Sequence, residues 1–227
     1  MTAQLKQEAA EAAVNSISSG MIVGLGHGST AIFALRKIAQ LLNKDILSNI
    51  TGIPCSLQTK QQAIELGIPL TTLEEHPIVD ILIDGADEID SQMNMIKGGG
   101  GALLREKIVA QSSRKCIYIA DESKYSDYLG EKWAVPVEVL HFGWKSTRKF
   151  IESLGATVTV RQTKEGENFL TDQSNLIMDC NFGVMQSPET VGSALKSRAG
   201  IVEHGLFVGI AHEIIIAGTN GLRSLTR

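Results

Sequence analysis

The stretch Gly24-Leu-Gly-His27-Gly28-Ser29-Thr30 contains the residue types that hold a phosphate group. Its glycines let the backbone turn tightly and approach an anion, and a helix that starts after it would add N–H groups at the positive end of its dipole. Ser29 and Thr30 add hydroxyl donors. The dinucleotide fingerprint needs glycine where Ser29 stands, and the P-loop needs a Gly-Lys pair that is absent. A cradle for one phosphate and a tight turn capped by Ser or Thr both remain open.

The next stretch is acidic and consists of Asp84-Gly85-Ala86-Asp87-Glu88-Ile89-Asp90. Four carboxylates in seven residues repel one another, so some must be solvated, protonated, bound to a metal or opposite a cation. Lys97 is a nearby cation in the sequence. Ligation of a metal ion by Asp84 and Asp87 and a solvated acidic turn are the two alternatives.

A lysine followed by four glycines forms the third stretch, Lys97-Gly98-Gly99-Gly100-Gly101. Such a run is entropically costly, and a flexible hinge is its simplest explanation. Because a lysine precedes it and a helix follows, backbone N–H groups and an ammonium group could instead meet at one oxyanion. Glu106 lies in the first turns of that helix and points back toward its start. A salt bridge with a neighbouring Arg or Lys is the alternative for this carboxylate.

Two further lysines could supply positive charge to a small anionic ligand. Lys124 ends the segment Ala120-Asp-Glu-Ser-Lys124 just beyond an expected strand, and Lys6 lies on the first expected helix. Solvation is the plainer explanation for both. Apart from His27, the histidines are scattered without metal-binding spacing, so we expect no metal site.

These stretches belong to an alternation of strands and helices. Apolar periodicity predicts helices at residues 2–19, 30–42, 57–66 and 102–111, and strands at 21–26, 50–54, 79–83 and 115–120. Ser56 is the expected N-cap of the third helix. The alternation predicts an α/β fold with a doubly wound, mostly parallel, Rossmann-like sheet, whose ligands bind at the carboxyl ends of the strands.

After Gly130 the pattern becomes strand, helix, strand, strand, helix, strand, which indicates a smaller α+β domain of the split-βαβ, ferredoxin-like kind. We assign residues 1–130 plus 205–227 to the Rossmann-like catalytic domain. Residues 131–204 form the smaller domain, which we expect to serve oligomerisation. The apolar segments 206–210 and 214–217 are expected to return to the first sheet.

The composition is that of a globular protein of 227 residues, with 43% hydrophobic and 20% charged residues. The formal net charge of −4 indicates no excess of basic residues that would bind nucleic acid or an anionic membrane surface. Cys55, Cys116 and Cys180 are far apart and odd in number, which favours the reducing cytosol over a disulfide framework. We therefore expect a cytoplasmic protein whose partner is a small molecule.

Four motifs occur together in one order and spacing: Gly-Leu-Gly-His-Gly-Ser-Thr, Asp-Gly-Ala-Asp-Glu, Lys-Gly-Gly-Gly-Gly-Ala-Leu-Leu-Arg-Glu-Lys and Ala-Asp-Glu-Ser-Lys. In this combination the chain resembles ribose-5-phosphate isomerase of the A type over nearly its full length. The resemblance implies interconversion of ribose 5-phosphate and ribulose 5-phosphate in the non-oxidative pentose phosphate pathway. It also implies an enzyme without metal or organic cofactor that forms a homodimer or tetramer.

The resemblance also implies roles for the residues at the reacting end of the sugar. Glu106 matches the general base that moves a proton between C1 and C2 through a cis-enediolate. Lys97 and the glycine backbone at Gly98, Gly99 and Gly100 match the group that stabilises the enediolate oxygens. Asp84 and Asp87 match the carboxylates that bind sugar hydroxyls and assist ring opening.

At the other end of the sugar, four residues match positions that contact the phosphate or close the site: Lys6, Ser29, Thr30 and Lys124. Gly28, Gly85 and Ala86 are expected to line the same substrate site. His27 is also expected at the substrate site, although it departs from the family pattern, which usually has threonine there.

Two other functions use the same motifs. A metal-dependent phosphotransferase or phosphatase would use Asp84 and Asp87 as metal ligands. A sugar-phosphate sensor would keep the phosphate cradle and lack the base. A DNA-binding regulator is disfavoured because no basic helix-turn-helix segment is present.

Overall fold

The computed structural model describes residues 2–227, which form two compact units. Unit 1 contains the chain up to Ala86 together with Arg105–Lys124 and Ile210–Arg227. Unit 2 contains Asp87–Leu104 and Tyr125–Gly209. Across the described residues, every helix is too short or too polar to cross a membrane.

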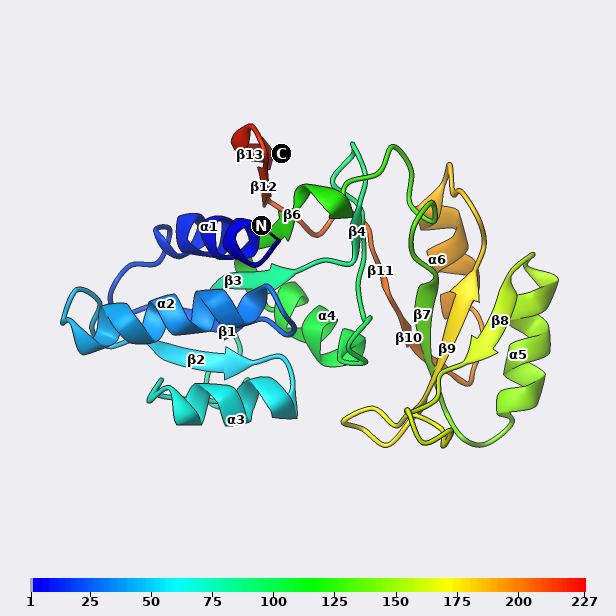
Figure 1. Ribbon diagram of the computed structural model, residues 1–227. Helices are drawn as coiled ribbons and strands as arrows, with labels where there is room; N and C mark the ends of the chain where they lie inside the picture. The colour runs from blue at the N-terminus through cyan, green and yellow to red at the C-terminus, as the bar shows by residue number, and fades with distance from the viewer. Residues whose placement is uncertain (1) are drawn as a thin grey trace. The chain divides into compact units, whose positions relative to one another are not determined.

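Unit 1 is built on a six-stranded sheet with the order β13-β12-β6-β3-β1-β2 (Figure 1). Its strands are β1 (Ile22–Leu25), β2 (Thr51–Pro54), β3 (Val79–Gly85), β6 (Ser113–Asp121), β12 (Glu213–Gly218) and β13 (Gly221–Thr226). Neighbouring strands are parallel except in the β12–β13 hairpin. The doubly wound, mostly parallel sheet predicted from the sequence is confirmed.

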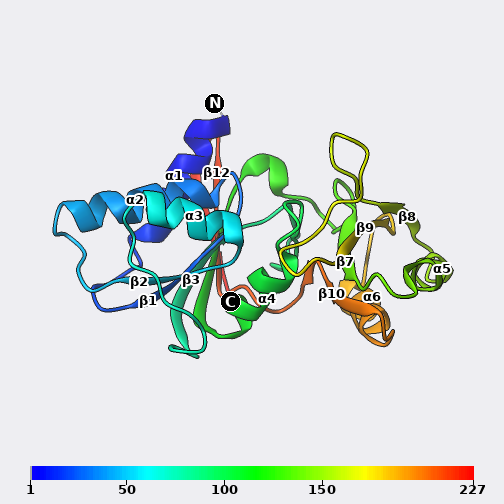
Figure 2. The same ribbon diagram turned by 90° about the horizontal axis from the view of Figure 1, so that it is seen from below.

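Helices cover both faces of this sheet (Figure 2). They are α1 (Thr2–Val14), α2 (Ala31–Asn43), α3 (Leu57–Glu65) and α4 (Leu103–Gln111), followed by the short 3-10 helix η1 (Glu122–Lys124). Alternate residues of the central strands point to opposite faces. Val23 and Ile81 therefore join the core beneath α1 and α2, whereas Leu82 lies on the face that packs against Val109 of α4. Burial on both faces explains the continuous apolar runs of β1 and β3.

The first helix is shorter than the sequence pattern predicts. It ends at Val14 because Asn15, Ser16 and Ile17 form tight turns, in which each N–H donates to the carbonyl three residues earlier. The N-cap prediction at Ser56 is confirmed, since its hydroxyl accepts the N–H of Thr59 at 2.9 Å.

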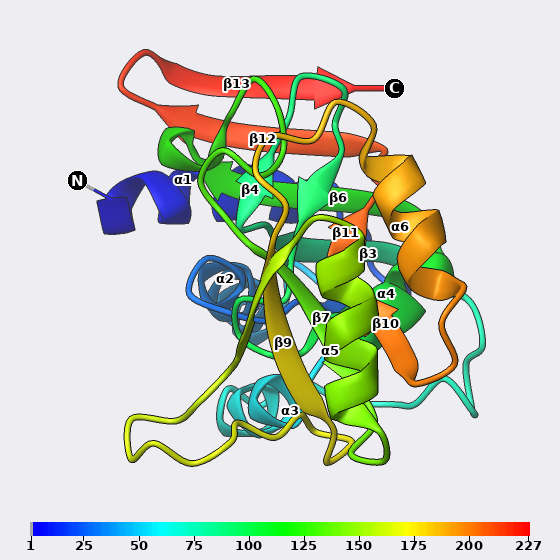
Figure 3. The ribbon, with the colours of Figure 1, turned by 90° about the vertical axis from the view of Figure 1, so that its right-hand side faces the viewer.

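Unit 2 contains a four-stranded antiparallel sheet with the order β10-β7-β9-β8. The chain runs through β7 (Val135–Val139), α5 (Trp144–Ser153), β8 (Thr157–Val160), β9 (Leu176–Asn181), α6 (Pro188–Lys196) and β10 (Ile201–His204). This element order and strand order are those of a ferredoxin-like fold, which confirms the prediction. Ile151 of α5 and Leu195 of α6 join one core with the apolar side chains of the sheet, so both helices cover the same face (Figure 3).

A second, three-stranded sheet in unit 2 has the order β11-β5-β4. Its strands are β4 (Glu88–Ile89), β5 (Met95–Ile96) and β11 (Leu206–Phe207). The expectation that residues 206–210 return to the first sheet is therefore wrong, because Leu206 and Phe207 pair with β5 instead. The expectation for residues 214–217 is confirmed, since β12 pairs with β6. The β4–β5 hairpin also groups residues 87–104 with unit 2, outside the boundary drawn from the sequence.

The three cysteines are free thiols inside the two units. Cys55 and Cys116 lie in unit 1 and Cys180 lies in unit 2, and all three are at most 1% exposed. Burial, reinforced by the charge of Asp84, raises the pKa of Cys116 to about 12. Burial also raises the pKa of Cys180, with a further contribution from Asp179.

Candidate functional site

Three predicted segments leave the same edge of the sheet in unit 1. β1, β3 and β6 are parallel neighbours, so their carboxyl ends lie side by side (Figure 1). β1 leads into the loop that ends at Thr30, β3 ends at Gly85, and β6 leads into η1 with Lys124. This is the edge at which α/β sheets of this kind bind ligands.

Asp84 ties the first two segments together. Its side chain is fully buried, and Oδ1 accepts the N–H of His27 at 3.0 Å and the N–H of Gly85 at 2.7 Å. The loop passes so close that a Cβ on Gly26 would lie 2.4 Å from Asp84 Oδ1 and 2.5 Å from Asp84 Cα. Glycine at position 26 is therefore a packing requirement.

The imidazole of His27 is held by a chain of hydroxyl groups. Thr59 Oγ1 donates to the carbonyl of Gly26 at 3.1 Å, so its only proton is used there. The Ser56 hydroxyl must then donate to Thr59 Oγ1, at 2.9 Å, and can only accept from His27. Because His27 Nδ1 lies 2.9 Å from Ser56 Oγ, Nδ1 carries a proton.

The residues predicted for the phosphate end are partly brought together. Lys6 Nζ of α1 donates to Ser29 Oγ at 2.9 Å, across 23 positions of the sequence. Thr30 precedes α2 in the N-cap position and makes no side-chain capping hydrogen bond. A Cβ on Gly85 would lie 3.8 Å from Thr30 Cβ, so the end of β3 is adjacent to the loop. Lys124 lies on η1, just beyond the end of β6.

Glu106 lies in the first turn of α4, as predicted, and is 3% exposed. Its charge and that of Asp84 both act on Tyr118 of β6, which is fully buried. Burial is the main cause that raises the pKa of Tyr118 well above its ordinary value, and the charges of Cys116, Asp84, Cys55 and Glu106 add to it. Tyr118 therefore stays a neutral phenol near two of the predicted catalytic carboxylates.

Asp87, Lys97 and the glycine run belong to unit 2. Lys97 is 2% exposed, its N–H donates to the carbonyl of Gly205 at 2.8 Å, and its ammonium group lies 5.5 Å from the centre of the Phe207 ring. Asp87 Oδ2 accepts the N–H of Gly99 at 2.7 Å. The predicted acidic turn and the predicted glycine loop are thus directly joined.

The glycine run forms a defined turn. The N–H of Gly101 donates to the carbonyl of Gly98 at 2.9 Å. The guanidinium group of Arg161 donates to the carbonyls of Gly98 and Gly99 at 2.9 and 3.0 Å. The simple explanation of a flexible hinge does not describe a loop that is held by these contacts.

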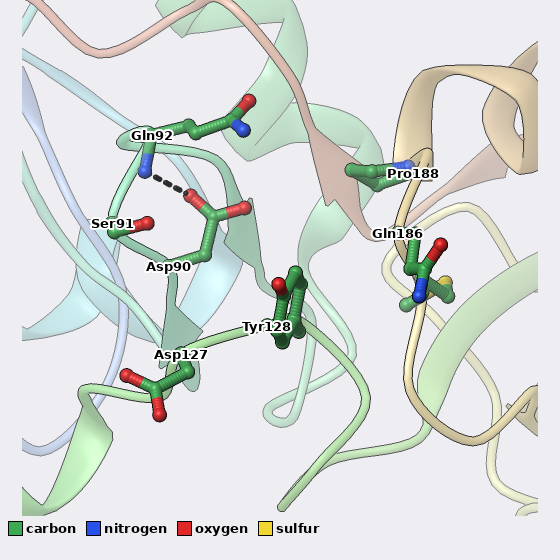
Figure 4. A pocket seen from close by; sticks show the side chains of 8 residues that line it. Asp90, Ser91, Gln92, Asp127, Tyr128, Gln186 and Pro188 are labelled. Carbon is green, nitrogen blue, oxygen red and sulfur yellow. Dashed lines mark hydrogen bonds between the residues drawn. The ribbon is translucent and has the colours of Figure 1, made fainter.

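A polar cavity of about 340 Å³ lies in unit 2. The loop Asp90–Gln92 forms one side, Asp127 and Tyr128 the next, and residues 185–188 at the start of α6 the other (Figure 4). Asp90 is already engaged, because Oδ1 accepts the N–H groups of Gln92 and Asn94. None of the residues predicted for the substrate site lines this cavity.

Three contributors were not identified from the sequence: Tyr118, Arg161 and the pairing of Ser56 with His27. Tyr118 sits within an apolar strand and has the pattern of a core residue. Arg161 is about 60 positions from the loop it contacts, and a single arginine after a strand carries no local signal. Among residues 2–227, no group of three or more His, Cys, Asp or Glu side chains has the arrangement of a metal site.

Comparison with known proteins points to one family. Residues 51–221 match the family model described as ribose 5-phosphate isomerase A (phosphoriboisomerase A). The chain is 54% identical to ribose-5-phosphate isomerase A of Desulfatibacillum aliphaticivorans over 99% of both chains, and 51% identical to that of Chloroflexus aurantiacus over 97% of this chain and 92% of the relative.

Solved structures give the same result. A D-ribose-5-phosphate isomerase in complex with phospho-erythronic acid is 34% identical, with a TM-score of 0.98 over 100% of both chains. The ribose 5-phosphate isomerase of Plasmodium falciparum is 41% identical, with a TM-score of 0.95 over 99% of both chains. The chain therefore belongs to the ribose 5-phosphate isomerase A family, a family of isomerases.

Proposed function

We propose that the chain interconverts ribose 5-phosphate and ribulose 5-phosphate by moving a proton between C1 and C2 through a cis-enediolate. Family membership over nearly the whole length supports this substrate. The observation that carries the mechanism is Glu106, a carboxylate 3% exposed in the first turn of the helix that follows the lysine–glycine loop. A related enzyme binds phospho-erythronic acid, a sugar-acid phosphate.

Glu106 acts as the general base in this proposal. It takes the proton from C2 and returns it to C1, so one group serves both carbon steps. In the same conversion the proton of the C2 hydroxyl is transferred to the C1 oxygen, which balances the change from aldose to ketose. A proton on a carbon beside a carbonyl is a very weak acid, and positioned acid–base catalysis contributes about 10² to 10⁴-fold. The base therefore needs help from groups that stabilise the developing oxyanion.

Lys97 and the backbone of the glycine loop supply that stabilisation. A fixed ammonium group and fixed N–H donors stabilise negative charge without reorganising during the reaction. The N–H of Gly99 donates to Asp87. The N–H of Gly101 donates to the carbonyl of Gly98. We therefore assign the enediolate contacts to Lys97 Nζ and to the N–H groups of Gly98 and Gly100.

The other predicted residues bind the ends of the substrate. Asp84 and Asp87 accept hydrogen bonds from sugar hydroxyls and assist ring opening. Ser29, Thr30 and the lysines at positions 6 and 124 hold the phosphate, with the contact of Lys6 to Ser29 as support. Binding energy from the remote phosphate then orients the reacting carbons.

The proposal extends to the setting of the enzyme. Ribulose 5-phosphate and ribose 5-phosphate are exchanged in the non-oxidative pentose phosphate pathway, and we place the activity there. Three buried free thiols support a reducing, cytoplasmic location. A homo-oligomer is expected from the family resemblance, and light scattering of the purified chain would measure its mass.

The decisive experiment compares Glu106→Gln with the wild-type chain on ribose 5-phosphate in the presence of EDTA. The amide has nearly the same shape but cannot accept the proton. We expect kcat to fall by about 10²-fold or more while KM stays within a few fold. Glu65→Gln is the matched control, because it removes the same charge from an exposed helix position.

Two results would contradict the proposal. One is a kcat of Glu106→Gln within a few fold of wild type, which would remove Glu106 from the base role. The other is an absence of ketose formation in the wild-type chain, which would leave the metal-dependent phosphotransferase and the sugar-phosphate sensor as the alternatives. Incorporation of solvent deuterium at C1 of the product separates an isomerase from a pure binder.

A further inference from the structure

The glycine loop of unit 2 is held by an arginine that lies far away in the sequence. Arg161 follows β8, and its Nη1 donates to the carbonyl of Gly98 at 2.9 Å and to that of Gly99 at 3.0 Å. The side chain of Arg161 is only 15% exposed. A single guanidinium nitrogen thus holds two consecutive peptide groups.

The guanidinium group is itself fixed in place. Its Nε donates to Asp179 Oδ2 at 2.9 Å, and its Nη2 donates to Asp179 Oδ1, which makes a bidentate ion pair. Phe169 stacks nearby, with its ring centre 5.8 Å from the guanidinium carbon. The N–H of Arg161 also donates to the carbonyl of Ile177 at 2.8 Å. Because the planar guanidinium group is held in this way, it also fixes the positions of the two glycine carbonyls to which it donates.

Because each peptide group is planar, a carbonyl held by Arg161 also sets the direction of the N–H on the opposite side of the same peptide. In a trans peptide the C=O and the next N–H point in opposite directions. Arg161 holds the Gly98 carbonyl, and the N–H of the same peptide, that of Gly99, donates to Asp87. Arg161 also holds the Gly99 carbonyl, so the N–H of Gly100 points away from Arg161.

The cationic hydrogen bond has a chemical effect as well as a geometric one. A carbonyl that accepts a hydrogen bond from a cation polarises its amide and makes the N–H a stronger donor. The N–H of Gly100 is therefore both aimed and strengthened. Within the run Gly98 and Gly101 are buried, Gly99 is half-buried and Gly100 is exposed, so Gly100 is the glycine of the loop that is most open to a ligand.

Phe169 closes the loop from another side. Gly101 has a φ of +80°, and a Cβ at this position would lie 2.4 Å from the Phe169 ring. The ring therefore fills the space that any other residue at position 101 would need. Phe169 and Arg161 together fix the end of the loop from which α4 begins.

We propose that Arg161 is a positioning residue for the isomerisation, which holds the Gly99–Gly100 peptide so that the N–H of Gly100 donates to the enediolate oxygen. The inference rests on the proposed function. Arg161 holds the loop by its hydrogen bonds to the carbonyls of Gly98 and Gly99. Asp179 and Phe169 contribute by fixing the guanidinium group of Arg161. The expected consequence is a specific loss of transition-state stabilisation when the guanidinium group is removed.

The test measures kcat and KM of Arg161→Ala, Arg161→Lys and Arg148→Ala. We expect Arg161→Ala to lose about 10 to 10²-fold in kcat with KM within a few fold, because the donor acts on charge that develops in the transition state. Arg161→Lys should recover only part of this loss, since an ammonium group cannot bind the carboxylate and two carbonyls together. Arg148 pairs with Glu152 on the exposed face of α5, so its removal should leave kcat unchanged.

Two further readouts separate positioning from a loss of folding. Millimolar guanidinium ion should restore part of the kcat of Arg161→Ala and should not affect Arg148→Ala. Phospho-erythronic acid carries a carboxylate, and its inhibition constant should rise in parallel with the loss of kcat while KM for ribose 5-phosphate does not. If Arg161→Ala does not fold, Asp179→Asn takes its place, because it keeps the arginine and loosens it.

The outcomes separate this inference from the proposed function. If wild type isomerises ribose 5-phosphate and Glu106→Gln does not, a folded Arg161→Ala with normal kcat overturns the role of Arg161 alone. The same holds if KM and the inhibition constant rise together, or if guanidinium ion restores nothing. If the wild-type chain has no isomerase activity, the proposed function fails and this inference fails with it.

Discussion

The two glycine loops of the chain are anchored by different kinds of contact. The loop after β1 lies against the neighbouring strand, where the N–H of Gly26 donates to the carbonyl of Ile83 and the N–H of His27 donates to the carboxylate of Asp84. Hydroxyl side chains also contact it, as in the hydrogen bond from Thr59 Oγ1 to the carbonyl of Gly26. The loop before α4 is held by side chains, chiefly Arg161 and Asp87. The first loop therefore has main-chain atoms of a central strand packed against it, whereas the contacts of the second loop with Arg161 and Asp87 can each be removed by a single substitution.

The largest effect is expected at Gly26. A Cβ there would lie 2.4 to 2.6 Å from Asp84 Oδ1, Asp84 Cα and the Ile83 carbonyl, and the backbone of a central strand cannot move away. We expect Gly26→Ala to lower the free energy of unfolding by about 3 kcal/mol. Chemical denaturation measures the change.

Gly85→Ala is the matched control for this prediction. The nearest atoms to a Cβ at position 85 are 3.8 Å away, so we expect a loss below about 1 kcal/mol. Equal stability losses for the two variants would show that the strand does not constrain the first loop as described.

A smaller effect is expected at Gly101 in the second loop. Gly101→Ala places a side chain at a φ of +80° and against the Phe169 ring, and we expect a loss of about 2 kcal/mol. Because the clash is with a side chain, Phe169→Ala in the same chain should relieve part of it. The double variant should then lose less than the sum of the single losses, as a double-mutant cycle in denaturant would show.

Strict additivity in that cycle would contradict the comparison. It would mean that the ring does not confine the loop, and that only the backbone conformation at Gly101 matters. No second-site change of this kind is available for Gly26, whose neighbours include main-chain atoms.

The smallest effect concerns the proton of His27. We expect nitrogen NMR to find Nδ1 protonated, because the hydroxyls of Ser56 and Thr59 leave Ser56 Oγ only the acceptor role. Ser56→Ala should shift the neutral ring toward the Nε2–H tautomer and cost about 1 kcal/mol of stability through the lost N-cap. An Nε2–H tautomer in the wild-type chain would disprove the hydroxyl chain.

The sequence predicted the features that depend on neighbouring residues and missed those that depend on contacts between distant parts of the chain. The strand–helix alternation, the N-cap at Ser56 and the position of Glu106 depend on neighbours within a few residues, and these predictions hold. The C-terminal strand Gly221–Thr226 was missed because it is an exposed edge strand with little apolar alternation. Leu206 and Phe207 were assigned to the wrong sheet because an apolar pair does not encode its partner strand.

The candidate site divides in the same way. The glycine, aspartate and lysine motifs are visible in the sequence because each is contiguous. Arg161 and Tyr118 were not, because their relation to the site arises only when β8 and β6 are placed beside other strands. Sequence spacing therefore identified the groups proposed to touch substrate and missed the groups that hold them.

The buried cysteine thiols can report local opening of the fold, because each reacts with an alkylating reagent only when the structure around it opens. Burial raises the pKa of Cys116 to about 12, so this thiol stays protonated at neutral pH, and at 1% exposure it is shielded from alkylating reagents in the closed fold. Cys116 and Cys180 sit in different units, so mass spectrometry of alkylated peptides would time the opening of each unit separately. Unlabelled wild-type sequence suffices for the measurement, without introduced dyes or tags.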